Sequence, residues 1–170
     1  LLNFSEYAPP EGPIYLPEQY AAMLRDLAAP LQERVFKKAT GALPIAGRTQ
    51  LYELSPPEAG SWSISVQEIG LDWPQRLEEW LSQAQRKQVT SLRFVLNAQK
   101  PSVGAAVESL RQHGFFFGGL APRWFGSDGI LLQKIFHKEP DFEGIRLYSR
   151  QARELCSFIR ADREAVSIYA

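Results

Sequence analysis

Strict alternation of apolar and polar residues marks the clearest strand of this chain. In SWSISVQEI (61–69), Trp62, Ile64 and Val66 share one face of an extended chain, and the serines between them occupy the other. This pattern predicts a strand with one buried face. Other runs rich in apolar residues predict strands at 33–39, 49–54, 91–97, 115–124 and 129–136. Asp128 and Gly129 form an Asp-Gly pair, which predicts a tight hairpin turn between the last two strands.

Apolar residues at helical spacing predict four helices. Pro17 opens the first helix, and Asp72 is expected to cap the second, with Gln75 as its capping-box partner. The third helix follows Ser102 and ends at Gly114 in a left-handed cap, with His113 in its last turn, where a histidine complements the helix dipole. The apolar stripes comprise Tyr20, Met23, Leu24 and Leu27; Leu77, Trp80, Leu81 and Ala84; Val103, Ala106, Val107 and Leu110; and Ala152, Leu155, Cys156 and Ile159.

The order of these elements predicts a mixed α/β (α+β) domain in which helices pack on a sheet. A chain of 170 residues suits one domain with a real core. Residues 1–16 carry three prolines and are expected to form an extended lead-in or linker. Residues 17–170 then form a single domain, with an extra C-terminal helix at about 149–166.

The charge balance excludes several classes of function. Lysine plus arginine and aspartate plus glutamate number 19 each, so the chain lacks the basic excess of a nucleic-acid-binding protein. No apolar run approaches the ~18 residues of a membrane span. One cysteine and two histidines are poor material for a metal site. We therefore expect a cytoplasmic protein that binds no nucleic acid, no membrane and no metal.

The second half of the chain resembles a known family. The strand 91–97 is followed by a helix that ends in Gly114-Phe115 and then by a hairpin, as in the C-terminal half of the GNAT (GCN5-related N-acetyltransferase) fold. This resemblance implies a mostly antiparallel central sheet with helices on both faces. More narrowly, GFFFGGLAPRWFGSDGILLQ (114–133) resembles the C-terminal, degenerate GNAT-like domain of larger bacterial multi-domain proteins. The implied partner is an upstream GNAT-like or regulatory domain of the same protein.

The resemblance also places a cofactor loop between residues 67 and 72. GNAT enzymes cradle the pyrophosphate of acetyl-CoA or another acyl-CoA on backbone N–H groups at a helix N-terminus. Gln67 and Gly70 stand at matching positions, so Gln67, Ile69, Gly70 and Leu71 are the expected cofactor-binding residues. Asp72 replaces the final small residue of the family pattern. A carboxylate there competes for the N–H groups and repels a pyrophosphate.

The resemblance makes Glu68 the candidate general base, because it lies at the end of the strand that precedes this loop. If its side chain follows the parity of Trp62, it faces the core, and burial suits it to proton transfer. If the strand has already left the core, Glu68 is solvated. The tyrosine that family members commonly use as general acid is replaced by Leu110, which carries no proton to donate.

Two functions of different classes remain open at this stage. One is an acyl-CoA-dependent N-acyltransferase with a degraded cofactor loop. The other is a non-catalytic GNAT-like domain that serves as an interaction or ligand-sensing module. The departures at Asp72 and Leu110 favour the second, and the element order favours the first.

Overall fold

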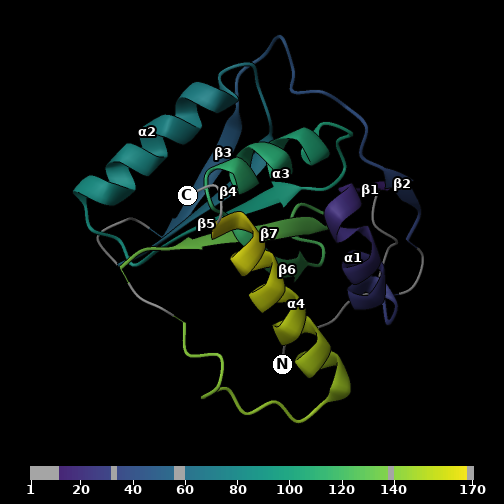
Figure 1. Cartoon of the computed structure of the whole chain (residues 1–170). Helices are drawn as coiled ribbons and strands as arrows, with labels where there is room; N and C mark the ends of the chain where they lie inside the picture. The colour runs from purple at the N-terminus through teal and green to yellow at the C-terminus, as the bar shows by residue number, and fades with distance from the viewer. Residues whose placement is uncertain (1–11, 32–33, 56–59, 138–139, 168–170) are drawn as a thin grey trace, which may run out of the picture.

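The computed structural model describes residues 12–31, 34–55, 60–137 and 140–167 (Figure 1). It confirms the predicted mixed α/β class. The strands are β1 (Ile14–Leu16), β2 (Phe36–Lys38), β3 (Gln50–Ser55), β4 (Ser61–Glu68), β5 (Ser91–Asn97), β6 (Phe116–Ala121) and β7 (Gly129–Ile135). The helices are the 3-10 turn η1 (Glu18–Tyr20), α1 (Ala21–Ala28), α2 (Trp73–Arg86), α3 (Val103–Gln112) and α4 (Arg150–Val166).

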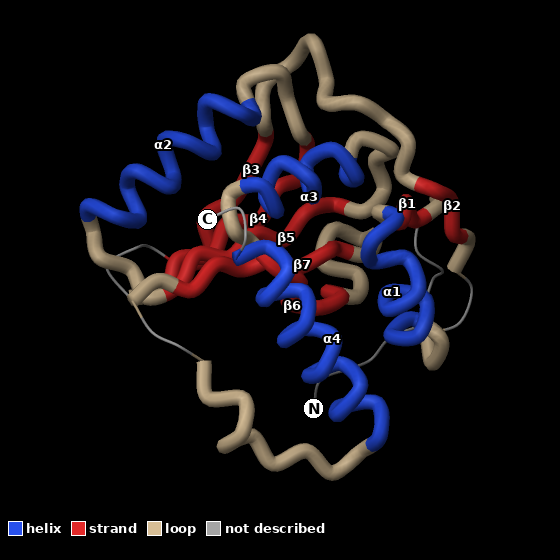
Figure 2. Tube along the Cα trace, viewed as in Figure 1, coloured by secondary structure: helices blue, strands red, loops and turns tan. Residues whose placement is uncertain are grey.

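The main sheet has five strands in the order β3-β4-β5-β7-β6 (Figure 2). β4 and β5 are parallel, in register from Ser61 opposite Ser91 to Val66 opposite Leu96. The other neighbouring pairs are antiparallel, so the sheet is mostly antiparallel as expected. A parallel pair needs a crossover connection, and α2 supplies it between β4 and β5.

The core lies on the sheet face predicted from the alternation in β4. Trp62, Ile64 and Val66 are each no more than 1% exposed. Phe94 of β5 lies beside them and contacts two indole rings of α2, with ring centroids 5.8 Å from Trp73 and 5.4 Å from Trp80. Aromatic pairs at this spacing add stability beyond the area that they bury.

The helices meet this same core. Leu24 of α1, Leu77 of α2 and Val107 of α3 are buried in it, and Phe158 of α4 packs against it. For the described residues, the face covered by helices is therefore the one that carries Trp62, whereas helices were expected on both faces. Figure 1 shows α2 and α3 above the sheet and α4 passing in front of it, beside β6.

The N-terminal strand belongs to the folded unit. Ile14 and Leu16 are each 2% exposed, and β1 pairs in parallel with β2 in a small second sheet. Tyr15 N donates to Ala98 O at 2.7 Å, which attaches β1 to the end of β5. The first 11 residues of the predicted lead-in lie outside the described residues, whereas its last part contributes to the core.

The step from α3 into β6 follows the sequence pattern. Gly114 has a φ of +79°, which confirms the predicted left-handed cap. The strand register shifts between Phe117 and Gly119, which marks a β-bulge at the two glycines. A Cβ atom at Gly118 would lie 2.8 Å from Leu131 Cγ, which explains why a glycine is needed there.

The predicted tight turn at Asp128 is wrong. β6 ends at Ala121 and β7 begins at Gly129, so the connection is longer than a two-residue turn. Asp128 is fully buried. Its carboxylate accepts hydrogen bonds from Arg34 Nε at 2.7 Å and from Arg123 N at 2.9 Å. A buried carboxylate needs such partners, and one of them comes from 94 residues earlier in the chain. The Asp-Gly pair therefore reflects a buried ion pair and not an exposed turn.

Candidate functional site

The predicted cofactor-binding residues form the connection between β4 and α2. Gln67 is half-buried in β4, and Ile69 is 8% exposed and joins the hydrophobic core. Gly70 is buried, whereas the side chain of Leu71 is 57% exposed. The structure thus brings the four residues together at the start of α2, where the sequence placed them. They differ in burial, from the core residue Ile69 to the exposed Leu71.

The backbone N–H groups at this helix start already donate to the chain itself. Gly70 N donates to Thr49 Oγ1 at 3.1 Å, and Leu71 N donates to Gly47 O at 3.2 Å. Trp73 N donates to Gly70 O at 3.2 Å, and Pro74 has no N–H. An anion cradle needs N–H groups that point at the ligand. This helix start therefore offers few free donors to a pyrophosphate.

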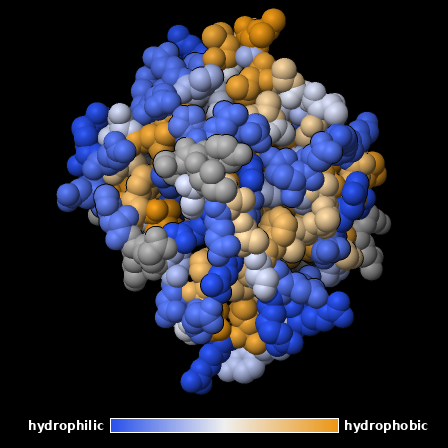
Figure 3. Space-filling model, in the orientation of Figure 1, coloured by the Kyte–Doolittle hydropathy of each residue, from blue (hydrophilic) through white to orange (hydrophobic). Residues whose placement is uncertain are grey.

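The segment 47–49 lies directly against Gly70. A Cβ atom at Gly70 would lie 2.3 Å from Arg48 C and 2.4 Å from Thr49 N. Figure 3 shows hydrophobic residues gathered at the upper tip of the molecule, where Figure 1 places the loop that leads into β3 beside the start of α2. Ile45, 95% exposed, belongs to this loop. The chain's own backbone is therefore packed against the loop that the family resemblance assigns to the cofactor.

Asp72 is the N-cap residue of α2, but its side chain makes no cap hydrogen bond. Its Oδ1 instead accepts from Thr49 N at 2.7 Å and from Thr49 Oγ1 at 2.8 Å. Partial desolvation raises the pKa of Asp72, but the hydrogen bonds from Thr49 outweigh it and the pKa is lowered overall. The predicted capping box is wrong, because the Asp72 side chain makes no cap hydrogen bond and the Gln75 side chain bonds to Glu79 Oε1. An ionised carboxylate is therefore fixed where a pyrophosphate would approach.

Glu68 lies at the end of β4 and pairs with Lys100. The carboxylate Oε1 is 2.7 Å from Lys100 Nζ, and the two side chains are 38% and 41% exposed. This exposure matches the alternative in which the strand has left the core at residue 68. Glu68 is therefore a surface ion-pair partner in this structure and not an enclosed base.

A side-chain bridge closes the sheet where β4 and β5 end. Asn97, 3% exposed, donates from Nδ2 to Gln67 O at 3.4 Å. Its Oδ1 accepts from Ser127 Oγ at 2.8 Å and from Gln99 N at 3.0 Å. The two parallel strands are thus held together beyond their last paired residues, Val66 and Leu96.

The position expected to supply a general acid holds a core residue. Leu110 is fully buried in the apolar stripe of α3. Ser102 occupies the N-cap position of α3, but its side chain makes no cap hydrogen bond. Neither residue supplies an acid suited to protonating a leaving thiolate.

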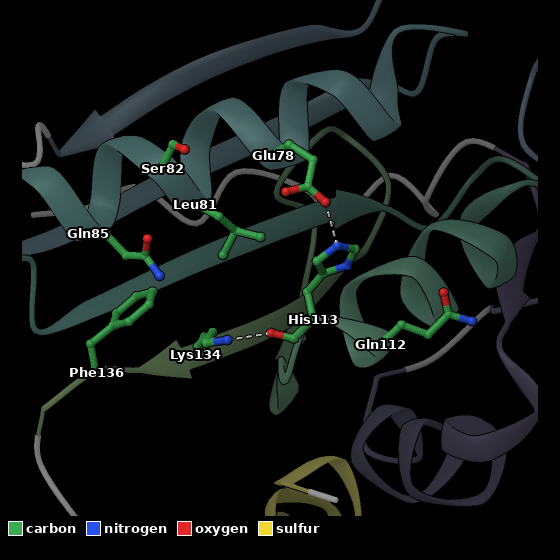
Figure 4. A pocket seen from close by; sticks show the side chains of 8 residues that line it. All are labelled: Glu78, Leu81, Ser82, Gln85, Gln112, His113, Lys134 and Phe136. Atoms are coloured by element: carbon green, nitrogen blue, oxygen red, sulfur yellow. Dashed lines mark hydrogen bonds and ion pairs between the residues drawn. The ribbon is translucent and has the colours of Figure 1, made fainter. Parts of the chain in front are cut away.

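A separate pocket opens between the second half of α2, the end of α3 and β7 (Figure 4). Its volume is about 280 Å³. The ammonium of Lys134 donates to His113 O at 2.6 Å and lies 5.7 Å from the ring centroid of Phe136. The lining residues are Glu78, Leu81, Ser82, Gln85, Gln112, His113, Lys134 and Phe136. We call this site the Lys134 pocket.

His113 connects α3 to α2 at the rim of this pocket. Its Nδ1 is 2.7 Å from Ser109 O, and its Nε2 is 3.0 Å from Glu78 Oε1. The contact with a carbonyl in the last turn of α3 agrees with the predicted role at the helix C-terminus. Because a carbonyl and a carboxylate both accept, the two contacts are simultaneous hydrogen bonds when the imidazole carries both protons.

This pocket was not predicted, although the sequence of the last strand carries a signal for it. In GILLQKIF (129–136), Ile130, Leu132, Lys134 and Phe136 share one parity. A lysine in the inward-facing series of a strand is unusual, because lysine is rarely buried without a partner. A lysine at an inward-facing position of a strand therefore indicates a site where its ammonium has a polar role.

The comparisons with known proteins give no assignment. No protein-family model, no curated protein and no solved structure matches this chain. Within the described ranges, no group of histidine, cysteine, aspartate and glutamate side chains is arranged to hold a metal ion. None of the described helices combines the length and apolarity needed to span a membrane.

Proposed function

We propose that this chain is a GNAT-like domain without acyl-transfer chemistry, which serves as an interaction or ligand-sensing module in a larger bacterial protein of the cytoplasm. One observation carries the proposal: Gly70 N and Leu71 N, the donors expected to cradle a cofactor phosphate, donate to the segment 47–49. A cofactor must displace that segment before it binds.

Electrostatics at the same place supports the proposal. The carboxylate of Asp72 is held beside the helix start by two hydrogen bonds from Thr49. A pyrophosphate brought to this helix start would meet that negative charge at close range, and the Arg76 guanidinium, 3.7 Å from Asp72 Oδ2, offsets part of the charge. The helix dipole alone contributes ~0.3–1 kcal/mol to anion binding at an exposed terminus, which is too little to offset both effects.

The alternative function, acyl-CoA-dependent N-acyltransferase activity, draws its support from the order of elements. β4, α2 and β5 form a parallel crossover unit, and Gly114 leads from α3 into β6. For this alternative, Glu68 has to leave Lys100 and the segment 47–49 has to move away from Gly70. The implied cofactor is acetyl-CoA or another acyl-CoA.

Titration with acetyl-CoA and CoA separates the two functions. A ligand that binds the native state alone raises its stability by about 2.7 kcal/mol at 100 times its Kd. We expect no change in Tm and no heat of binding at millimolar CoA. A CoA-dependent rise in Tm that grows in Asp72→Asn, but not in the surface control Asp26→Asn, would establish the cofactor cradle and contradict the proposal. Gly70→Glu is unsuitable as a test, because any side chain there collides with Arg48 and Thr49.

If the domain is an interaction module, we propose that it contacts an upstream GNAT-like or regulatory domain of the same protein. Hydrogen exchange of this domain, measured alone and within the longer protein, tests it. We expect a contiguous surface to gain protection in the longer protein. Identical exchange in both contexts would argue against an interdomain contact and leave ligand sensing as the remaining role.

A further inference from the structure

Lys134 projects from the inner face of the sheet. It is the register partner of Leu92, and Leu92 is fully buried on the face that carries the core. Residues directly opposite in an antiparallel pair point to the same side of the sheet. The lysine side chain therefore emerges among core residues and reaches toward the end of α3, where its ammonium meets the His113 carbonyl.

The ammonium of Lys134 has donors to spare. An ammonium carries three N–H donors, and the structure gives this one a single acceptor, His113 O at 2.6 Å. No ion pair of Lys134 with a carboxylate is seen among the described residues, and the carboxylate of Glu78, which also lines the pocket, lies 3.0 Å from His113 Nε2. Burial lowers the pKa of Lys134, which is the behaviour of a partly desolvated cation that has no anionic partner.

The rest of the Lys134 pocket supplies a polar rim and an apolar wall. Figure 4 shows the side chains of Gln85 and Phe136 on one side of Lys134, with His113 and Gln112 on the other. Leu81 and Phe136 are half-buried and pack against the core, so they present apolar surface to the pocket. One cationic donor, neutral amides and an apolar wall in one concave site are the usual elements of a small-molecule site.

We propose that the Lys134 pocket binds a small organic carboxylate, with its head group on the Lys134 ammonium and its short apolar body against Leu81 and Phe136. The volume of about 280 Å³ is below the range of roughly 300–1,000 Å³ for larger ligands. The pocket holds one lysine and, at its rim, the carboxylate of Glu78, which disfavours a doubly charged phosphate. An amine is disfavoured by the lysine itself.

This site is independent of the proposed function. The pocket lies beside the start of β5, where Leu92 pairs with Lys134, whereas Glu68 and the β4–α2 loop lie at the other end of the parallel pair. Carboxylate binding here neither requires nor excludes acyl-CoA binding there. The titration with CoA and the titration with a carboxylate can therefore fail separately.

Butyrate is a suitable probe, with 1-butanol, butylammonium and sodium chloride at equal ionic strength as matched controls. We expect butyrate to raise the Tm and to shift the amide signals of His113, Gly114 and Lys134 in NMR spectra, and the three controls to do neither. Lys134→Met should weaken butyrate binding at least about tenfold, the loss expected for one charge-assisted hydrogen bond. Lys38→Met, which removes an ammonium that is 62% exposed and remote from the pocket, should leave binding unchanged.

Ser82→Phe provides a second variant that keeps Lys134 intact. Ser82 is an exposed residue of α2 that lines the pocket, so a phenyl ring there fills the site without disturbing the core. We expect it to abolish the butyrate-induced shifts even if Lys134→Met does not fold. Three outcomes would each overturn the proposal. They are the absence of any shift in the wild-type protein at about 50 mM butyrate, equal binding by Lys134→Met, and an equal response to 1-butanol.

Discussion

The Asp162 carboxylate of α4 accepts a hydrogen bond of 2.7 Å from the backbone N–H of Phe117 in β6. β6 is the last strand in the order of the main sheet, so this N–H belongs to an edge that would otherwise be open. The same carboxylate accepts from Tyr20 OH at 2.8 Å and forms an ion pair with Arg111. α4 thereby covers the sheet edge, which is where an unprotected strand would pair with another chain.

Removal of this carboxylate should destabilise the fold strongly. The side chains of Arg111 and Asp162 are 16% and 8% exposed, so Asp162→Ala leaves a largely buried guanidinium without its anion. We expect a loss of about 3–5 kcal/mol in the free energy of unfolding, measured by urea denaturation. Glu164→Ala on the same helix removes a carboxylate that is 68% exposed and should cost less than about 1 kcal/mol. Equal losses for the two variants would show that the buried cluster does not hold α4 in place.

Tyr20 should make stability fall in alkali. Burial first, and then the negative charge of Asp162, raise the pKa of the Tyr20 hydroxyl above its ordinary value of 10.0. Below pH ~10 the hydroxyl is protonated in both the folded and the unfolded chain, so it adds no pH dependence. Above that pH the unfolded chain loses the proton while the folded chain keeps it, so stability falls by up to about 1.4 kcal/mol per pH unit.

The test compares wild type with Tyr20→Phe between pH 9 and 11 by urea unfolding, a range that spans the ordinary tyrosine pKa of about 10. The variant should lose stability at neutral pH but show a shallower decline in alkali. Tyr148→Phe is the control, since its side chain is 90% exposed. Parallel pH profiles for wild type and Tyr20→Phe would contradict the assignment.

Local patterns in the sequence predicted much of the architecture. The alternation around Trp62 and Ile64 specified which face of β4 is buried, because residues two apart in a strand share a face. The cap at Gly114 and the start of the last helix near residue 149 are also where the sequence placed them, and the structure adds that Ser149 Oγ accepts from Ala152 N at 3.0 Å. These features depend on neighbours within a few residues, which is why a single sequence reveals them.

The polar partners could not be predicted in the same way. Asp72 reads as a helix cap, but its carboxylate turns to Thr49, which is 23 residues earlier. Asp128 reads as turn chemistry, but it pairs with Arg34. Which distant side chain reaches a carboxylate depends on the folded topology, and the spacing along the chain does not contain it. The sequence placed residues 67–72 at the connection between β4 and α2, where the structure has them, whereas the packing of 47–49 against that connection had no sequence signal.

The contact at Gly70 predicts that even one methyl group is harmful there. A Cβ atom would lie 2.3 Å and 2.4 Å from backbone atoms of Arg48 and Thr49, so the two segments have to separate. We expect Gly70→Ala to cost about 2–3 kcal/mol, as overpacking of a well-packed site does. In Gly104→Ala the new methyl group lies 3.0 Å from Ala39, and alanine gains up to about 1 kcal/mol of helix propensity. A larger loss at Gly104 than at Gly70, measured by thermal unfolding, would contradict this account of the loop.

Thr49 should control the acid stability of the same loop. The pKa of Asp72 is lowered in the folded protein, so its ionised form contributes stability above the unfolded pKa of ~3.9 and loses it as the pH falls through the folded value. Thr49→Val keeps the shape of the buried side chain but removes the hydroxyl that donates to Asp72 at 2.8 Å and accepts from Gly70 N. The variant should be about 1–3 kcal/mol less stable at neutral pH and should lose less stability between pH 5 and 2.

Thr90→Val is the matched control for this prediction. The Thr90 hydroxyl donates at 2.6 Å to the Gly60 carbonyl, which does not titrate, so this variant should keep the acid profile of the wild type. Urea unfolding followed by tryptophan fluorescence at each pH measures both variants. If Thr49→Val also keeps the wild-type profile, the Thr49 hydroxyl does not set the pKa of Asp72. The backbone N–H of Thr49, which donates to Asp72 at 2.7 Å and is kept in this variant, would then be the group that lowers the pKa of Asp72.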